Sequence, residues 1–263
     1  MNVVLAVALV LALAGMGSGW YTLKYRAGVK QRGMFGPWPI PKVPLEDLDP
    51  IFAFTPLGPS LETEVLFVGQ VGVRGTSIHG ATTDLEAWVL SVLAKKSRAL
   101  FEFGTCTGKT TYAWARNAPA GAEIVTLTLG PDQLASYLAE AGDHARDSRR
   151  ALTETTHDRF YYTGTVVEPR VTQLFGDSKH FDEAPYRDHF DLIFVDGSHA
   201  RSYVASDSAK ALRMCKPGGL ILWHDYAGPR VPGVFKALNE LARTLPLVHV
   251  AGTKLVAYRK PAR

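Results

Sequence analysis

The stretch Phe101–Gly108 constrains the fold of this chain more than any other part of its sequence. An apolar run at 99–103, with Glu102 in it, is followed by two glycines four positions apart, Gly104 and Gly108, and then by a helical pattern. This order is typical of a strand that enters a glycine-bearing turn and opens a helix. Glycine lets the backbone approach a ligand because it has no Cβ, and a helix N-terminus offers free N–H groups. Alone, the pattern fits an ordinary strand–turn–helix junction equally well.

From residue 100 onward, strand-like and helix-like segments alternate, which indicates a doubly wound parallel sheet. The patterns predict helices near 84–93, 108–117, 131–141, 201–214 and 233–244, and strands at 99–104, 123–129, 171–175, 191–195, 219–223, 247–250 and 254–258. The short link at 251–253 between the last two strands allows only an antiparallel hairpin, since a parallel crossover needs about a dozen residues. The predicted fold is therefore α/β: a doubly wound, Rossmann-like, seven-stranded sheet with a C-terminal antiparallel hairpin, preceded by an N-terminal hydrophobic helix.

The N-terminal segment is apolar from Val3 to Ala14 and carries no charge up to Tyr21. About 20 helical residues suffice to cross a hydrocarbon core of about 30 Å. Aromatic residues and then basic residues follow, which favours a cytoplasmic position for the rest of the chain. We therefore expect a transmembrane anchor with the catalytic domain in the cytoplasm. A cleaved signal peptide stays open, although no Lys or Arg precedes the apolar run, and so does a buried helix.

A proline-rich segment follows this N-terminal segment. Seven prolines lie between residues 36 and 59, so this stretch forms neither a continuous helix nor a central strand. It is typical of an extended linker. The predicted domains are an anchor or signal segment at 1–23, a linker and N-terminal extension at 24–82, and a catalytic domain at 83–263.

The composition indicates a globular protein and gives no support to nucleic-acid binding. Apolar residues make up 46% of the chain and charged residues 21%. Basic and acidic residues number 29 and 25, and the net charge of +4 is spread along the chain. The two cysteines, Cys106 and Cys215, have no metal or redox spacing. We expect no nucleic-acid partner, and a homo-oligomer is compatible with the sequence.

Polar side chains follow the predicted strands at one edge of the sheet. Ligands of open α/β sheets bind outside the carboxyl ends of the strands. Three acids besides Glu102, and two histidines, are costly to desolvate there without a ligand or a metal. In chain order, these ends deliver Glu102, Thr128, Asp177, Ser178, Asp196, His199, His224 and Asp225.

Three runs of this sequence resemble one enzyme family. FEFGTCTGKTT (101–111), FVDGSH (194–199) and KPGGLILWHDY (216–226) look like class I S-adenosylmethionine-dependent methyltransferases. The nearest branch is the family-24 type, which is related to sugar and macrolide O-methyltransferases. The resemblance covers roughly residues 83–259.

The resemblance implies how S-adenosylmethionine (SAM) is bound. In the family, the first turn holds the methionine end and the ribose, and the residues after the third strand hold the adenine. Thr128 departs from the pattern, because a Rossmann-type site expects an acid there that binds the ribose hydroxyls. Its loss would cost about 1–3 kcal/mol of binding free energy. The cofactor-binding residues implied are Glu102, Gly104, Thr105, Thr107, Gly108, Thr128, Asp177, Ser178 and Asp196.

The resemblance also implies a metal site and a general base. Metal-dependent relatives hold magnesium with acids after the fourth and fifth strands, which Asp196 and Asp225 match. His224 stands where relatives carry Glu or Asn; imidazole suits zinc, iron or nickel better than Mg²⁺, so either His224 is not a ligand or the metal differs. His199 matches the base of the relatives, and Asp196 is the second catalytic residue that we expect. On the residues alone, His199 is also a candidate cap of the following helix, and the two aspartates are candidate strand-end caps.

The predicted function is metal-assisted, SAM-dependent O-methylation of a hydroxyl on a sugar-containing or other small acceptor. The predicted membrane tether suggests a glycan or lipid-linked acceptor. Two alternatives stay open: a non-catalytic, membrane-tethered cofactor-binding protein, and an iron-dependent, hydroxylase-like oxidoreductase. The loops at 69–80 and 142–169 are expected to line the acceptor site.

Overall fold

The computed structural model describes residues 19, 39–53, 63–65, 82–154, 157 and 159–262. The chain divides into two compact units, 1–39 and 40–263. Nearly all of the first unit lies outside the described residues, and so does the predicted acceptor loop at 69–80. The fold below is that of the second unit.

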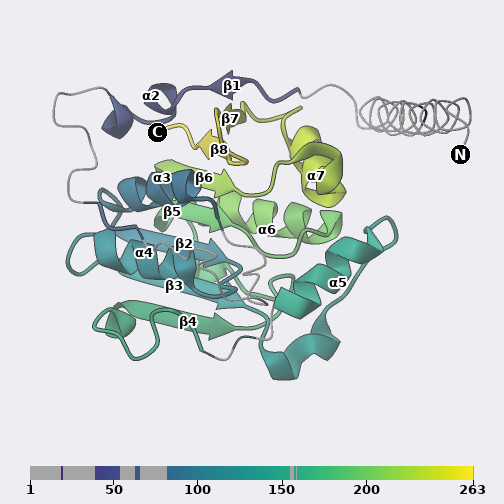
Figure 1. The fold of residues 1–263 in the computed structure, drawn as a ribbon, viewed down its shortest axis with the longest axis horizontal. Helices are drawn as coiled ribbons and strands as arrows, with labels where there is room; N and C mark the ends of the chain where they lie inside the picture. The colour runs from purple at the N-terminus through teal and green to yellow at the C-terminus, as the bar shows by residue number, and fades with distance from the viewer. Residues whose placement is uncertain are drawn as a thin grey trace, which may run out of the picture. The chain divides into compact units, whose positions relative to one another are not determined.

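The second unit is built on one eight-stranded sheet, in the order β1-β7-β8-β6-β5-β2-β3-β4 (Figure 1). All neighbouring strands are parallel except β8, which is antiparallel to both β6 and β7. All seven predicted strands are present, so the predicted sheet and its C-terminal hairpin are confirmed. The strands are β1 (Lys42–Val43), β2 (Ala99–Phe103), β3 (Glu123–Thr128), β4 (Val171–Phe175), β5 (Phe190–Val195), β6 (Cys215–Trp223), β7 (Val248–Val250) and β8 (Val256–Arg259).

Four helices cover the faces of this sheet: α3 (Asp84–Ala94), α4 (Lys109–Asn117), α6 (Arg201–Met214) and α7 (Pro232–Leu241). Helices α3 and α4 pack on each other, and α6 packs on α7 and on strands β5 and β6. Both faces of the central strands are therefore buried, which explains their nearly continuous apolar sequences.

Side-chain alternation along the strands decides which helix each residue meets. Leu100 and Phe194 belong to the apolar cluster that also contains Trp114 of α4. Trp223 faces the opposite side, where its indole N–H donates to the Ser208 hydroxyl of α6 at 2.8 Å. The same alternation places Glu102 and Phe103, at the end of β2, on opposite sides of the sheet.

The structure differs from the sequence predictions at three places. The helix expected at 131–141 is a short 3₁₀ turn, η2 (Pro131–Ser136), because the chain becomes extended at Tyr137. Helix α5 (Ala145–Glu154) lies inside the segment 142–169, which was predicted to be a loop. The proline-rich segment contributes β1 and α2 (Leu45–Leu48), and prolines flank β1 because an edge strand tolerates them. The remaining 3₁₀ turns are η1 (Pro50–Phe52), η3 (Glu168–Arg170), η4 (Ala184–Tyr186) and η5 (Gly228–Arg230).

The predicted transmembrane anchor and the membrane-anchored localisation are contradicted. Within the described part of the chain, no helix combines the length and the apolar character that a membrane crossing requires. The longest helix there, α6, has 14 residues, whereas a span needs about 20. The predicted segment 1–23 itself lies, apart from residue 19, outside the described residues.

Candidate active site

The first turn of the site requires glycine at position 104. Gly104 has φ +98°, and a Cβ there would lie 2.2 Å from the carbonyl oxygen of Asp196. Its N–H donates to the Leu127 carbonyl at 2.8 Å. The turn after β2 is thus packed between the carboxyl ends of β3 and β5, where no side chain fits.

The turn ends at Gly108, which caps helix α4 with φ +77° and without a side-chain hydrogen bond. A Cβ at Gly108 would lie 2.9 Å from both Phe160 and Tyr162. Between the glycines, Cys106 holds a left-handed φ of +46°. Such a conformation costs a non-glycine residue about 1–3 kcal/mol and is typical of functional sites.

A cavity, here called the turn pocket, opens beside this turn with about 570 Å³ of empty volume including its open mouth. It contains five of the predicted cofactor-binding residues: Gly104, Thr128, Asp177, Ser178 and Asp196. Its other lining residues are Phe103, Cys106, Leu127, Leu129, Tyr137, Ala151, Gly176, Gly197, Ser198, Tyr203 and Asp207.

Two stacked tyrosines form one wall of the turn pocket. The rings of Tyr137 and Tyr203 lie 4.5 Å apart at 7°. Tyr203 donates to Asp177 Oδ2 at 2.8 Å, and the hydroxyls of Tyr137 and Ser198 lie 2.8 Å apart. The wall therefore offers a flat apolar face with fixed polar groups at its edge.

The other four predicted cofactor residues do not line the turn pocket. Glu102 points toward α4, because successive strand residues face opposite sides and Phe103 takes the pocket side. Glu102 accepts hydrogen bonds from Thr111 and from Thr126, the latter at 2.9 Å. Burial raises its pKa to about 8, although these hydroxyls act to lower it. Thr105 belongs to the same hydroxyl cluster, 2.7 Å from Thr126 Oγ1.

Asp207 is an acid of the turn pocket that sequence reasoning missed. Its side chain is buried, and neither carboxylate oxygen has a hydrogen-bond partner among the described residues. Burial raises its pKa to about 7, against a lowering by the nearby Ser178 hydroxyl. A buried acid without a partner is costly unless a ligand supplies one.

A second cavity, here called the charged cavity, has about 970 Å³ of empty volume on the same measure. Its residues come from α5, from the ends of β5 and β6, from η5 and from the segment before β8. They are Arg146, Asp147, Arg150, His199, His224, Asp225, Ala227, Arg230, Val231 and Lys254.

The two cavities approach each other at a group of three residues. One potential ligand atom each from Asp196, His199 and Asp225 lies within 4.8 Å of the others. Asp196 lines the turn pocket, whereas His199 and Asp225 line the charged cavity. Two carboxylates and one imidazole at this separation are a donor set that fits a divalent cation.

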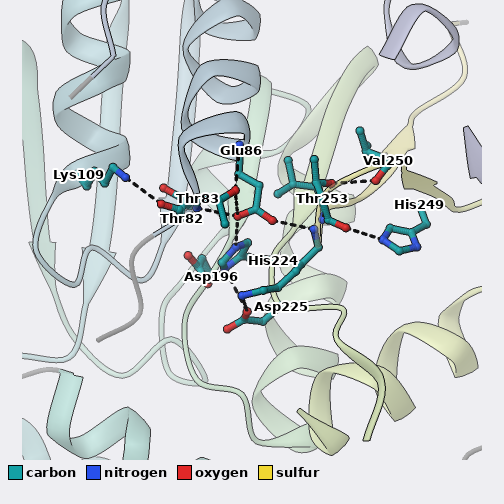
Figure 2. Close-up of polar contacts among 12 residues, drawn as sticks. Thr82, Thr83, Glu86, Lys109, Asp196, His224, Asp225, His249, Val250 and Thr253 are labelled. Carbon is teal, nitrogen blue, oxygen red and sulfur yellow. Dashed lines mark hydrogen bonds and ion pairs between the residues drawn. The ribbon is translucent and has the colours of Figure 1, made fainter. Parts of the chain in front are cut away.

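His224 lies beside this group, and carboxylates contact both of its ring nitrogens. Its ring lies between two carboxylates, 3.1 Å from Asp196 Oδ1 and 3.2 Å from Glu86 Oε2 (Figure 2). Burial favours the neutral ring, but Asp196 and Glu86 raise the pKa of His224 well above its usual value. Both ring nitrogens therefore lie against carboxylates, and neither is free to bind a metal.

Asp225 has a left-handed φ of +56° and lies among basic side chains. It lies 3.2 Å from His199 Nε2 and accepts from Lys254 Nζ at 2.9 Å. Burial acts to raise the pKa of Asp225, but the charges of His224, His199 and Lys254 lower it well below its usual value. His199 does not take the alternative role of helix cap, since α6 begins after Ala200 with no side-chain cap.

The part of the chain that contains this site matches a known protein family. Residues 101–226 match a family model described as a methyltransferase domain. This stretch, just under half of the chain, carries a methyltransferase domain of this family. The match begins in β2 and ends just after Asp225, so it contains the glycine turn and the group of three. No curated protein matches this methyltransferase.

Several solved structures are similar to this chain in a structural comparison. The SAH-bound methyltransferase PaMTH1 of Podospora anserina is 20% identical over 70% of this chain and 81% of that one, with a TM-score of 0.48. The O-methyltransferase TomG of Streptomyces achromogenes, in complex with SAM, is 19% identical over 69% and 82%, with a TM-score of 0.46. The Bacillus cereus O-methyltransferase bound to SAH is 18% identical over 69% and 84%, with a TM-score of 0.45. Likeness at this level adds nothing about the ligands or the substrate of this chain.

Sequence reasoning missed several residues of this methyltransferase for physical reasons. Tyr203 and Asp207 are four apart, so they share a face of α6, and this spacing could have revealed them. Glu86 and Lys254 are 168 residues apart in the sequence, yet the Lys254 N–H donates to Glu86 Oε1 at 2.7 Å. Only the folded sheet brings these two together.

Proposed function

We propose that this chain is a SAM-dependent O-methyltransferase. SAM would bind in the turn pocket, and the hydroxyl of a small acceptor would enter from the charged cavity. The observation that carries this proposal is the meeting of the two cavities at Asp196, His199 and Asp225.

The chemistry of the turn pocket suits SAM. The glycine turn allows close approach to the methionine end and the ribose. Asp177 and Ser178 would contact the adenine, and the tyrosine wall would offer a flat face for it. Asp207 would accept a hydrogen bond from an amine of the cofactor, which would satisfy its unpartnered oxygens.

Methyl transfer requires an in-line attack of the acceptor oxygen on the methyl carbon. The new C–O bond forms as the C–S bond breaks, and the electron pair of that bond stays on sulfur, which gives S-adenosylhomocysteine (SAH). The hydroxyl proton would pass to His199. Asp225, 3.2 Å from Nε2, would orient the ring and stabilise the imidazolium.

In a second possible mechanism, the group of three would bind a divalent cation that assists this reaction. Asp196, His199 and Asp225 would hold it, and its imidazole ligand would favour a transition metal over magnesium. Such an ion, when bound, lowers the pKa of an acceptor hydroxyl. His199 would then be a ligand and the proton would need another acceptor.

The test measures transfer of a labelled methyl group from SAM to a panel of small hydroxyl compounds by the full chain. We expect transfer, with SAH as the second product, and we expect His199→Ala to abolish it. Dialysis against EDTA separates the two mechanisms, because only the metal-assisted reaction stops and is restored by divalent ions. Failure of the chain to bind SAM at all would overturn the proposal.

A further inference from the structure

We propose that Glu86 is a positioning residue for methyl transfer, because it holds both carboxylates of the group of three from outside the two cavities. This inference rests on the proposed function, since it takes Asp196, His199 and Asp225 as the reacting centre. Glu86 lies in the first turn of α3, is buried, and lines neither the turn pocket nor the charged cavity.

The first connection runs from Glu86 to Asp196 through His224 (Figure 2). Glu86 Oε2 lies 3.2 Å from His224 Nε2, and His224 Nδ1 lies 3.1 Å from Asp196 Oδ1. The side chains of His224 and Glu86 are only 2% and 1% exposed, so these contacts rather than solvent set the orientation of the ring. The place of the Asp196 carboxylate therefore depends on that of Glu86.

The second connection runs from Glu86 to Asp225 through Lys254. The Lys254 backbone N–H donates to Glu86 Oε1 at 2.7 Å, and the Lys254 ammonium donates to Asp225 Oδ1 at 2.9 Å. Asp225 lies in turn 3.2 Å from Nε2 of His199, the proposed base. The two oxygens of one carboxylate thus serve the two acids of the group of three.

Helix capping alone does not explain a carboxylate at position 86. Glu86 and Thr83 form a capping box, in which the N–H and the hydroxyl of Thr83 each donate to Glu86 Oε2 at 2.8 Å. Glutamine serves equally well at this position of a capping box. A buried carboxylate is costly unless further groups satisfy it, and here those groups are the Lys254 N–H and the His224 ring.

Glu86→Gln separates the cap from the two connections. An amide has one acceptor oxygen, so when that oxygen keeps the contacts of Oε2, the NH₂ group faces the Lys254 N–H and two donors oppose each other. The reverse orientation places the NH₂ group against the N–H and the hydroxyl of Thr83. His224 loses the charge of its carboxylate partner in either orientation.

The experiment measures labelled methyl transfer by the full chain at saturating SAM, to the acceptor that the panel of hydroxyl compounds identifies. In Glu86→Gln, kcat should fall by roughly tenfold or more and SAH affinity by less than about threefold, because Glu86 does not line the turn pocket. Thr83→Ala is the matched control. It removes the hydroxyl of the same capping box but keeps the backbone N–H, so it should lower the urea midpoint and leave the kcat of the folded chain unchanged.

An equal loss of kcat in the two variants would reduce Glu86 to a helix cap and overturn the inference. Should Glu86→Gln not fold, Glu86→Asp replaces it: this change keeps the charge and suits a first helical turn, but its carboxylate is one methylene too short to reach both partners. Wild-type kcat in Glu86→Asp would equally overturn the inference.

A wild-type chain that transfers no methyl group would break the proposed function, and crystal structures then decide the inference. In the Glu86→Gln structure, the His224 ring and the Lys254 segment should be displaced, and the carboxylates of Asp196 and Asp225 with them. Carboxylates in their wild-type places would overturn the inference.

Discussion

The turn pocket and the charged cavity adjoin at Asp196 but are built from opposite chemistry. The turn pocket has aromatic walls, and its buried acid Asp207 has a pKa raised to about 7. The charged cavity has an ionised carboxylate, Asp225, whose pKa is lowered by the cations around it. The same side-chain type thus holds its proton more tightly in one cavity and loses it more readily in the other.

This difference indicates that two tasks, cofactor binding and acceptor chemistry, are separated along one edge of the sheet. A cavity with apolar walls and few charges suits the recognition of a large, mostly neutral cofactor. A cavity with fixed charges suits proton removal and the capture of a polar acceptor. Loss of function in each cavity should therefore be measurable separately.

The largest effect is expected from Asp225→Asn. His199 loses the carboxylate that orients it, so methyl transfer should fall by roughly 10²–10⁴-fold. SAM affinity, measured by calorimetry, should stay unchanged because Asp225 does not line the turn pocket. Asp132→Asn, a change at an exposed acid outside both cavities, is the control. Equal turnover of the two variants would remove Asp225 from the mechanism.

Gly104→Ala tests the turn pocket. The new Cβ would lie 2.2 Å from the Asp196 carbonyl oxygen, so the turn must move and SAM binding should be lost. Gly121→Ala is the matched control, since Gly121 also has a positive φ but no heavy atom within 4 Å of the added Cβ. It should cost only about 1–2 kcal/mol of stability in a urea titration. If both variants lost SAM binding to a similar degree, backbone strain alone, and not the close approach to Asp196, would explain why position 104 requires glycine.

Thr128→Asp asks whether the turn pocket lacks a ribose ligand. An acid at the end of β3 should accept hydrogen bonds from the ribose hydroxyls and tighten SAM binding by about tenfold. Thr128→Val, which has a similar shape and no acceptor, should weaken binding or leave it unchanged. Weaker binding in Thr128→Asp would show that the nearby acids Asp177 and Asp207 repel a further charge there.

The last expected effect is a pH dependence of stability that arises from Glu102. Its pKa is raised from its usual value near 4.5 to about 8 in the folded chain. The folded state holds this proton more tightly, so the contribution is complete below about pH 4.5 and is lost as the pH rises through about 8. In Glu102→Gln, the urea midpoint should therefore fall less between pH 5 and pH 8 than in the wild type. An identical slope in both proteins would contradict the raised pKa.

Much of the fold followed from local sequence patterns. Apolar strands with turn residues at their ends predicted all seven central and C-terminal strands, because burial on both faces leaves little freedom in their composition. Strand β1 has only two residues and is flanked by prolines, so no periodicity marks it. Helix α5 was missed because its sequence is strongly polar.

The site was predicted where it depends on strand ends and missed where it depends on long-range packing. Thr128 ends β3, and Asp177 and Asp196 follow β4 and β5 within two residues; the structure gathers all three in one pocket. Glu102 also lies at a strand end, but the alternation of side chains turns it toward α4. The arginines of the charged cavity carried no readable pattern, because α5 and η5 meet only in the folded chain.

The most direct test of the account titrates SAH into the full chain by calorimetry, beside Asp177→Asn and Asp225→Asn. The account predicts micromolar binding to the wild type, equal binding to Asp225→Asn, and binding about tenfold or more weaker to Asp177→Asn, which loses the pocket carboxylate held by Tyr203. Absence of binding to the wild type, or loss of binding in Asp225→Asn alone, would contradict the assignment of the turn pocket to the cofactor.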